Sequence, residues 1–344
     1  MTFFERWGTS QIQKYFYRID SRYHYNSIEE LFSSKRVLLY TFLAFLIGFI
    51  VTIPIIYMEI RWSIFDHNNI NLTNISIYIF EVMILITLEF YLLFILSFHL
   101  LAYHFHHLYF INSQHQIDYP TVDEEDFVSM LTRTVMEFSE GYEEDFNITH
   151  KDISNRDIIL IGIIYKLKVV ISNFILKFIA KKALTRTSLR LYTPYVAAIG
   201  TGVWDAFVFY KVIKDAQYKI TVRYAILYLI KSKLEYISKD ESIKAILARY
   251  YYYGEYNNNL SYLLHKIYKS HNFNFSKEDY LANQTFNNTN RDFTIFLFAT
   301  KESFLSIKER KVVKALDMDR SLKKLRRAFR SGDYSFIRGY IDGV

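Results

Sequence analysis

The side chains best suited to chemistry form a cluster of histidines after a long apolar run. Five of the ten histidines fall between His99 and His115. Imidazole is the commonest metal ligand in proteins, and nearby carboxylates could complete a divalent-metal site for zinc or iron. Two interpretations stay open: a metal site, or amphipathic rings at the headgroup level of a bilayer. The metal ligands would be His104, His106, His107 and His115.

Two carboxyl groups lie inside apolar segments. Glu89 is well inside one such segment, and Asp205 is the only acidic residue of residues 191–214. A charge at the centre of a bilayer costs about 2.5–3.5 kcal/mol, so Glu89 predicts a proton or cation site, or a polar contact to a partner helix, and Asp205 predicts a proton or ligand site. The alternatives are internal partners: Thr41 or Thr52 for a protonated Glu89, and Lys211, Lys214 or Arg190 for Asp205.

Two apolar segments would position the first of these groups. Residues 38–57 carry no charge, and at roughly 1.5 Å per residue a helix of about that length crosses a hydrocarbon core of roughly 30 Å. Residues 75–101 are apolar apart from Glu81, Glu89 and His99. Because the connection between them is short, residues 37–103 predict a transmembrane helical hairpin.

The distribution of positive charge predicts how this hairpin is oriented. Residues 1–36 hold six lysines and arginines, whereas the connection between the two apolar segments holds only Arg61. The side of the membrane with more positive residues is the cytoplasmic side. We therefore expect residues 1–36 to be a basic cytoplasmic segment and the C-terminus to be cytoplasmic as well.

The rest of the chain divides by charge. The protein has 344 residues, a net charge of +7 and no cysteine, which excludes disulfides and cysteine-ligated metal sites. Residues 104–150 hold one basic and ten acidic residues, which suggests a His-rich, then acidic, connector with one helix. Residues 151–344 hold 34 basic and 17 acidic residues. Such a surplus suits the anionic leaflet of a membrane.

The most basic element is expected near the C-terminus. Leu322, Leu325 and Phe329 would form the apolar edge of a helix. The surrounding cations predict contact with anionic lipids, with a solvated face as the alternative. Nucleic acid is not expected, because no recognised nucleic-acid-binding module accompanies the charge. The membrane-surface residues would be Lys323, Lys324, Arg326, Arg327 and Arg330.

Hydrophobic periodicity predicts helices and no sheet in this half of the chain. The fold class is therefore all-α: a transmembrane hairpin followed by a helical cytoplasmic, membrane-associated domain over 151–344. Residues 157–184 have the length of a membrane span, but Lys166, Lys168 and Lys177 interrupt them and favour a buried or interfacial helix. The other expected helices are 122–140, 216–237, 242–253, 260–268, 294–307 and 311–329.

A stripe of small residues is the most distinctive pattern of this half. Ala198, Gly202 and Ala206 recur every four residues, which would let another helix approach closely. With Pro194 before them and Asp205 among them, residues 155–235 resemble EcsC-like and related bacterial membrane-associated families. This resemblance implies a helical domain at the bacterial cytoplasmic membrane, with no established chemistry and no catalytic residue to transfer.

These patterns predict a non-enzymatic integral membrane protein. The P-loop, the G-x-S-x-G elbow and the H-E-x-x-H motif are absent from the sequence. We expect no cofactor, and a helical domain that binds the inner leaflet and a protein partner or a second copy. The alternatives are a transporter or channel component that uses Glu89 and Asp205, and a metal-dependent membrane enzyme that uses the histidine cluster.

Overall fold

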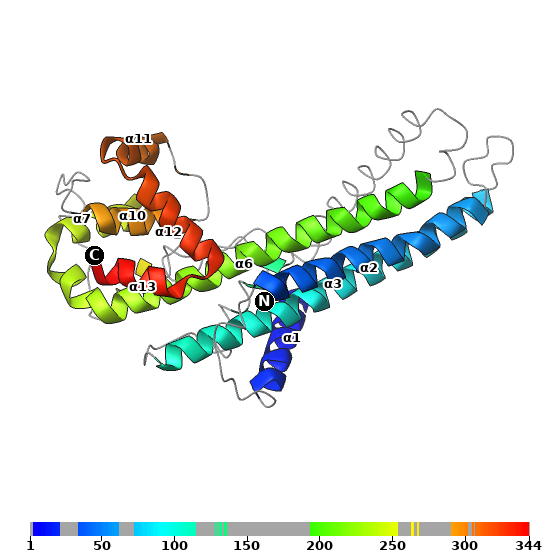
Figure 1. The fold of residues 1–344 in the computed structure, drawn as a ribbon, viewed down its shortest axis with the longest axis horizontal. Coiled ribbons are helices and arrows are strands. Elements are labelled where there is room, and N and C mark those ends of the chain that lie inside the picture. Colours follow the sequence, from blue (N-terminus) through cyan, green and yellow to red (C-terminus); the bar gives the residue numbers. More distant parts are fainter. Residues whose placement is uncertain are drawn as a thin grey trace. The chain divides into compact units, whose positions relative to one another are not determined.

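The structure, a computed structural model, consists of α-helices and short connections wherever it describes the chain (Figure 1). The described residues are 3–20, 34–61, 72–114, 128, 131–132, 134–135, 193–253, 263–264, 267, 290–301, 305 and 307–343. No strand occurs among them, so the predicted all-α class is confirmed for this part of the chain.

Two of these helices are long and apolar enough to cross a membrane. Helix α2 (Ser34–Arg61) contains the candidate span Lys35–Met58, and helix α3 (Leu72–Gln114) contains Ser76–His106. Both predicted spans lie inside these helices. Helix α3 continues past the predicted end at residue 101, because neither proline nor glycine interrupts the His-rich sequence that follows.

The start of α2 lies beside the later part of α3. Tyr40 of α2 shares a hydrogen bond of 2.6 Å with His99 of α3, and the Arg36 guanidinium lies 5.0 Å from the centre of the Tyr103 ring. The two helices are therefore antiparallel, and Figure 1 shows them side by side. Helix α2 continues through Pro54 to Arg61, so this proline does not end it.

A helix that was not predicted precedes this pair. Helix α1 (Phe3–Asp20) packs on α3 through aromatic contacts. The Trp7 ring lies 5.5 Å from Phe98 and 6.0 Å from Tyr91, and Tyr15 meets His99 edge-on at 4.9 Å. An added Cβ at Gly8 would lie 2.9 Å from the Phe98 ring. The basic N-terminal segment thus contains a packed helix.

The chain forms two compact units. The first unit contains α1, α2, α3 as far as Tyr103, and α6 (Thr193–Lys239) as far as Ile213. The second unit contains the remainders of α3 and α6 and the helices after them. Helix α6 is continuous over 47 residues, because its sequence has no proline or glycine after Gly202. It therefore includes the segment 216–237 that we expected as a helix of its own.

The second unit is built from short helices. Helix α10 is buried along nearly all of its length and packs against α12, which packs against α13. The Phe329 ring of α12 meets Phe296 of α10 at 6.3 Å and Tyr218 of α6 at 5.9 Å. The elements are α7 (Glu241–Tyr253), α10 (Arg291–Thr300), α11 (Ile307–Ala315), α12 (Asp319–Ser331) and α13 (Tyr334–Gly343).

Three boundaries in this unit differ from the prediction. The helix expected over 294–307 ends at Thr300. The helix expected over 311–329 is interrupted, because Asp317 adopts a left-handed backbone with φ 47° and Met318 is fully buried. Helix α13 was not predicted: Gly332, with φ 71°, ends α12, and the Asp333 carboxylate accepts the Phe336 N–H at the start of α13. The helices expected over 122–140 and 260–268 and the run 157–184 lie wholly or largely outside the described residues.

Candidate functional site

The first unit carries its polar and apolar side chains in an unusual arrangement. Among its described residues, polar groups such as Glu89 and Asp205 are buried, with 8 % and 7 % of their surface exposed. Large apolar side chains are exposed instead, for example Leu38 at 69 % and Phe80 at 66 %. We call the exposed side chains the outer apolar face. On α2 and α3 it comprises Leu38, Leu39, Phe42, Leu43, Ile50, Ile53, Tyr57, Ile77, Ile79, Phe80, Met83, Ile84, Leu88, Tyr91 and Leu92.

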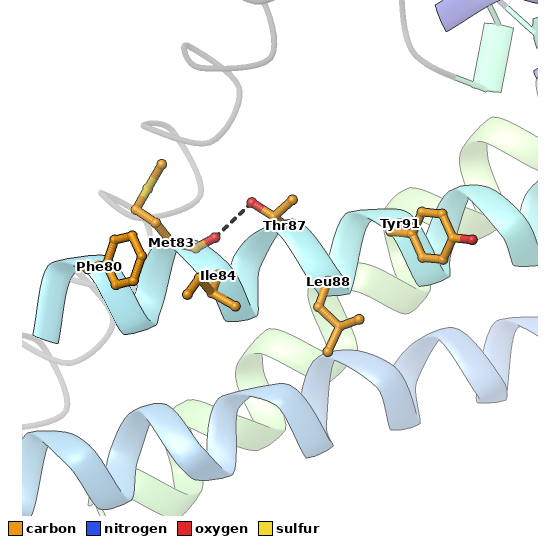
Figure 2. A pocket seen from close by; sticks show the side chains of 6 residues that line it. All are labelled: Phe80, Met83, Ile84, Thr87, Leu88 and Tyr91. Carbon is orange, nitrogen blue, oxygen red and sulfur yellow. Dashed lines mark hydrogen bonds between the residues drawn. The ribbon is translucent and has the colours of Figure 1, made fainter. Parts of the chain in front are cut away.

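Part of this face is a shallow hollow on α3. Figure 2 shows the six side chains that line it: Phe80, Met83, Ile84, Thr87, Leu88 and Tyr91. Thr87 donates its hydroxyl hydrogen to the carbonyl oxygen of Met83 at 2.8 Å, within the same helix. The hollow therefore presents a mostly apolar surface, which suits hydrocarbon better than a polar ligand.

Asp205 lies where α6 packs against α2. An added Cβ at Gly48 of α2 would collide with the Asp205 carboxylate, and its distance to Asp205 Cγ would be 2.9 Å. One turn earlier, an added Cβ at Gly202 would lie 2.7 Å from the carbonyl oxygen of Phe45. The two glycines allow the backbones to approach closely at this point. Asp205 therefore points into the helix pair and away from the outer apolar face.

The predicted small-residue stripe lies on the same side of α6. Ala198 and Gly202 are buried, whereas Ala206 is only half-buried. Gly202 contacts Phe45 of α2 within the same chain. At this glycine, the stripe packs two helices of one protein together.

The threonines considered as partners of Glu89 already bond within their own helix. Thr41 donates to the carbonyl oxygen of Val37, and Thr52 donates to that of Gly48, both at 2.7 Å. Neither hydroxyl hydrogen is then available to Glu89. A bond in which a protonated Glu89 donates to one of these hydroxyls stays an untested prediction.

The histidine cluster is divided between different surroundings. His104 and His106 are buried, the side chain of His107 is not described, and His115 lies outside the described residues. No group of three potential metal ligands occurs among the described residues. His99 lies instead in an aromatic cluster with Tyr15, Tyr40 and Tyr103, which the sequence analysis did not foresee. This cluster fastens three helices of the first unit to one another.

The five basic residues predicted for the membrane surface divide into three groups. Lys324, Arg327 and Arg330 are exposed on α12. Lys323 is exposed too and pairs with Asp319 at 2.6 Å. Arg326 is half-buried and donates to the carbonyl oxygens of Phe298, at 2.9 Å, and Lys301, at 3.4 Å. Its position near the C-terminal end of α10 suits a cation, because unbonded carbonyls make that end partly negative.

The apolar edge of α12 is used inside the second unit. Leu322, Leu325 and Phe329 are buried there with α10. They are therefore not available for insertion into a membrane. The exposed side of α12 that remains is charged, so any contact it makes with a bilayer is electrostatic.

Sequence analysis also missed a buried ion pair. Lys301 Nζ lies 2.6 Å from Glu309 Oε1, and both side chains are less than one-tenth exposed. Tyr218 of α6 donates to the backbone carbonyls of Ala299 and Lys301 beside it. The sequence does not predict this pair, because Lys301 follows α10 and Glu309 belongs to α11. The two side chains meet only when these segments fold together.

Comparison of the chain with protein-family models, with curated proteins and with solved structures finds no match. The resemblance of residues 155–235 to EcsC-like proteins therefore stays a prediction. The candidate site rests on the geometry of the chain itself: an outer apolar face, buried carboxyl groups and a basic surface on α12.

Proposed function

We propose that this chain is a non-enzymatic integral membrane protein of the bacterial cytoplasmic membrane. Its helices α2 and α3 cross the bilayer, and both termini are cytoplasmic. The C-terminal helices lie at the inner leaflet, bind anionic lipids and contact a protein partner as part of a membrane complex.

The observation that best supports this proposal is that α2 and α3 expose large apolar side chains while a carboxyl group is buried. In water, apolar side chains are buried and charged ones are exposed. Here Glu89 is buried, while fifteen large apolar side chains of α2 and α3 are exposed. Hydrocarbon favours this arrangement, because polar groups inside a membrane face the interior of the helix bundle. A bilayer around α2 and α3 accounts for both halves of the pattern.

The basic surface of α12 supports the proposed contact with lipids. Each cation near an anionic leaflet contributes about 1 kcal/mol, and α12 has exposed cations at Lys324, Arg327 and Arg330. Because the apolar edge of α12 is buried, we expect binding that weakens as salt is raised.

The test uses the full chain in vesicles. A fluorophore on Ser331→Cys, which would be the only cysteine, reports the approach of α12 to lipids with nitroxide-labelled headgroups. We expect quenching that requires anionic lipid, falls with salt, and is weakened by Lys324→Gln with Arg327→Gln. The matched control neutralises Lys311 and Lys314, which are exposed on α11. Quenching that ignores lipid charge would overturn the leaflet contact.

Two further measurements test the remaining parts. Extraction of the chain from its own membranes by alkaline carbonate would exclude the transmembrane placement. Native mass spectrometry of gently extracted protein tests the complex: we expect additional protein mass, and a bare monomer in every detergent would contradict it.

A transporter or channel component is the second candidate, and the burial of Asp205 and Glu89 favours it. Buried intramembrane carboxyl groups often mark proton or ion pathways. If this is correct, Glu89→Gln and Asp205→Asn abolish a pH- or ion-driven flux in vesicles. Unchanged flux in both variants would leave the candidate without support.

A further inference from the structure

The two parts of helix α6 expose different kinds of side chain. In its first part, within residues 193–213, the exposed large side chains are Ile199, Val203, Trp204, Phe207 and Tyr210, with Phe207 59 % exposed. In its second part the exposed side chains are mainly polar: Asp215, Lys231, Ser232, Glu235 and Lys239, with Tyr236 among them. One continuous helix therefore changes from a surface typical of lipid to one typical of water.

The buried side of the first part shows the complementary pattern. Thr201 and Asp205 are buried together with Ala198 and Gly202. Asp205 faces Gly48 of α2, which belongs to a candidate membrane span. The one acidic residue of this apolar stretch is thus directed toward another helix, as expected for a helix surrounded by hydrocarbon.

Length and charge fit a crossing of the bilayer. Between Arg190 and Lys211 the sequence contains one charged residue, Asp205. A helix over residues 193–213 is about 30 Å long at roughly 1.5 Å per residue, which matches a hydrocarbon core of about 30 Å. Lys211 and Lys214 follow at the end of this stretch, where lysine side chains can reach the headgroups.

We infer that the first part of α6 is a third membrane-crossing helix, whose outer side contacts lipid acyl chains through Ile199, Val203, Phe207 and Tyr210. The inference rests on the proposed function, since the outer apolar face of α2 and α3 is the surface that it extends. Among the described helices, α2 and α3 are the ones whose length and apolar composition alone indicate a membrane span. The assignment of α6 comes instead from which of its side chains are exposed.

The direction of α6 fixes which end is cytoplasmic. Figure 1 shows the first part of α6 alongside α2 and running in the opposite direction. With the start of α2 on the cytoplasmic side, Thr193 lies on the far side and Ile213 on the cytoplasmic side. The chain therefore leaves the bilayer at Lys214 toward the cytoplasm.

The sequence contains no cysteine, so each introduced cysteine can be labelled without removing others. Spin labels on Val203→Cys and Phe207→Cys report contact with oxygen, which concentrates in hydrocarbon, or with a water-soluble nickel complex. Matched positions are Ile50→Cys on α2, Met83→Cys on α3, and Glu235→Cys on the second part of α6. These side chains are exposed, and the described contacts of Phe207 with Trp204 and of Glu235 with Lys239 lie within α6, so their replacement leaves the contacts of α6 with α2 in place.

We expect labels at Val203 and Phe207 to behave like those at Ile50 and Met83, with frequent contact with oxygen and little contact with the nickel complex. A label at Glu235 should contact the nickel complex more than oxygen. Nickel contact at Val203 and Phe207 with oxygen contact at Ile50 and Met83 would overturn the inference and leave the proposed function intact. Nickel contact at all four positions would overturn both.

A second measurement tests the direction. A membrane-impermeant maleimide should label Thr193→Cys only when added to the outside of intact cells, and Asp215→Cys only when added to inverted vesicles. Labelling of both positions from one side would exclude a crossing between them, whatever the spin labels report.

Discussion

Arg326 of α12 donates a hydrogen bond of 2.9 Å to the carbonyl oxygen of Phe298, in the last turn of α10. The neighbouring Arg327 is exposed. Two adjacent arginines of the predicted membrane surface therefore have separable roles: Arg326 holds two helices together, and Arg327 faces outward.

Replacing each arginine by glutamine should separate stability from lipid binding. Arg326→Gln loses a charge-assisted hydrogen bond, so we expect the free energy of unfolding to fall by about 1–2 kcal/mol. Arg327→Gln should change it by less than about 0.5 kcal/mol. In the vesicle assay Arg327→Gln should weaken binding to anionic lipid about fivefold, equivalent to roughly 1 kcal/mol. Equal stability of the two variants would contradict the capping role of Arg326.

The close approach of α6 to α2 predicts opposite effects for two nearby glycines. An added Cβ at Gly202 meets the backbone of Phe45 at 2.7 Å, whereas at Gly200 it meets nothing within 4 Å. Gly202→Ala should lower the free energy of unfolding of the detergent-solubilised chain by about 1–3 kcal/mol. Gly200→Ala should be neutral or stabilising by up to about 1 kcal/mol, because alanine favours helices. A destabilisation of equal size in both would show that the contact is not the cause.

The buried pair of Lys301 and Glu309 predicts strong non-additivity. Lys301→Met leaves a buried carboxylate without the ammonium at 2.6 Å, and Glu309→Leu leaves the ammonium without the carboxylate. Each single change should cost about 3–5 kcal/mol, while the double change should recover most of that loss. Chemical unfolding of the four proteins measures this coupling. The exposed pair of Lys323 and Asp319 is the control, with an expected coupling below about 1 kcal/mol.

Two buried tyrosines predict a loss of stability at alkaline pH. Burial raises the pKa of the Tyr224 and Tyr334 phenols above the usual value, and the Tyr224 phenol raises that of Tyr334 further. From about pH 10 upward the unfolded chain releases these protons while the folded chain keeps them. The stability present below about pH 10 is then lost by up to about 1.4 kcal/mol per pH unit for each tyrosine.

Tyr334→Phe should therefore flatten the fall of stability above about pH 10, which amide exchange of α13 across the pH series would measure. The exposed Tyr17→Phe is the control and should leave the slope unchanged. A slope that is the same in Tyr334→Phe and the unmodified chain would show that Tyr334 ionises with equal ease in both states.

Helices α2 and α3 were predictable from their apolar runs, because the length and polarity of a candidate membrane span depend only on consecutive residues. Helix α1 was missed although its buried positions Gly8, Ile12, Phe16 and Ile19 recur every three or four residues, because the charged and polar residues between them hide this short pattern. The break between α11 and α12 was missed for another reason. Local propensity permits a helix through Met318, and only the burial of that side chain in the tertiary fold decides against it.

Partners that are distant in sequence were not predictable. Asp205 was recognised as unusual from its apolar surroundings, but nothing in the sequence points to Gly48 as its neighbour. Arg326 and Arg327 have the same side chain, and only their position relative to α10 distinguishes a cap from a surface charge. Sequence identifies which residues are unusual, whereas the packing of helices decides what each one contacts.

The contact between Gly48 and Asp205 joins residues more than 150 positions apart in the chain. During translation α2 therefore leaves the ribosome long before its neighbour α6 is made. Until then the glycine side of α2 lacks the neighbour that it has in the finished fold. Assembly of the first unit is consequently late, because it requires residues that are synthesised well after α2.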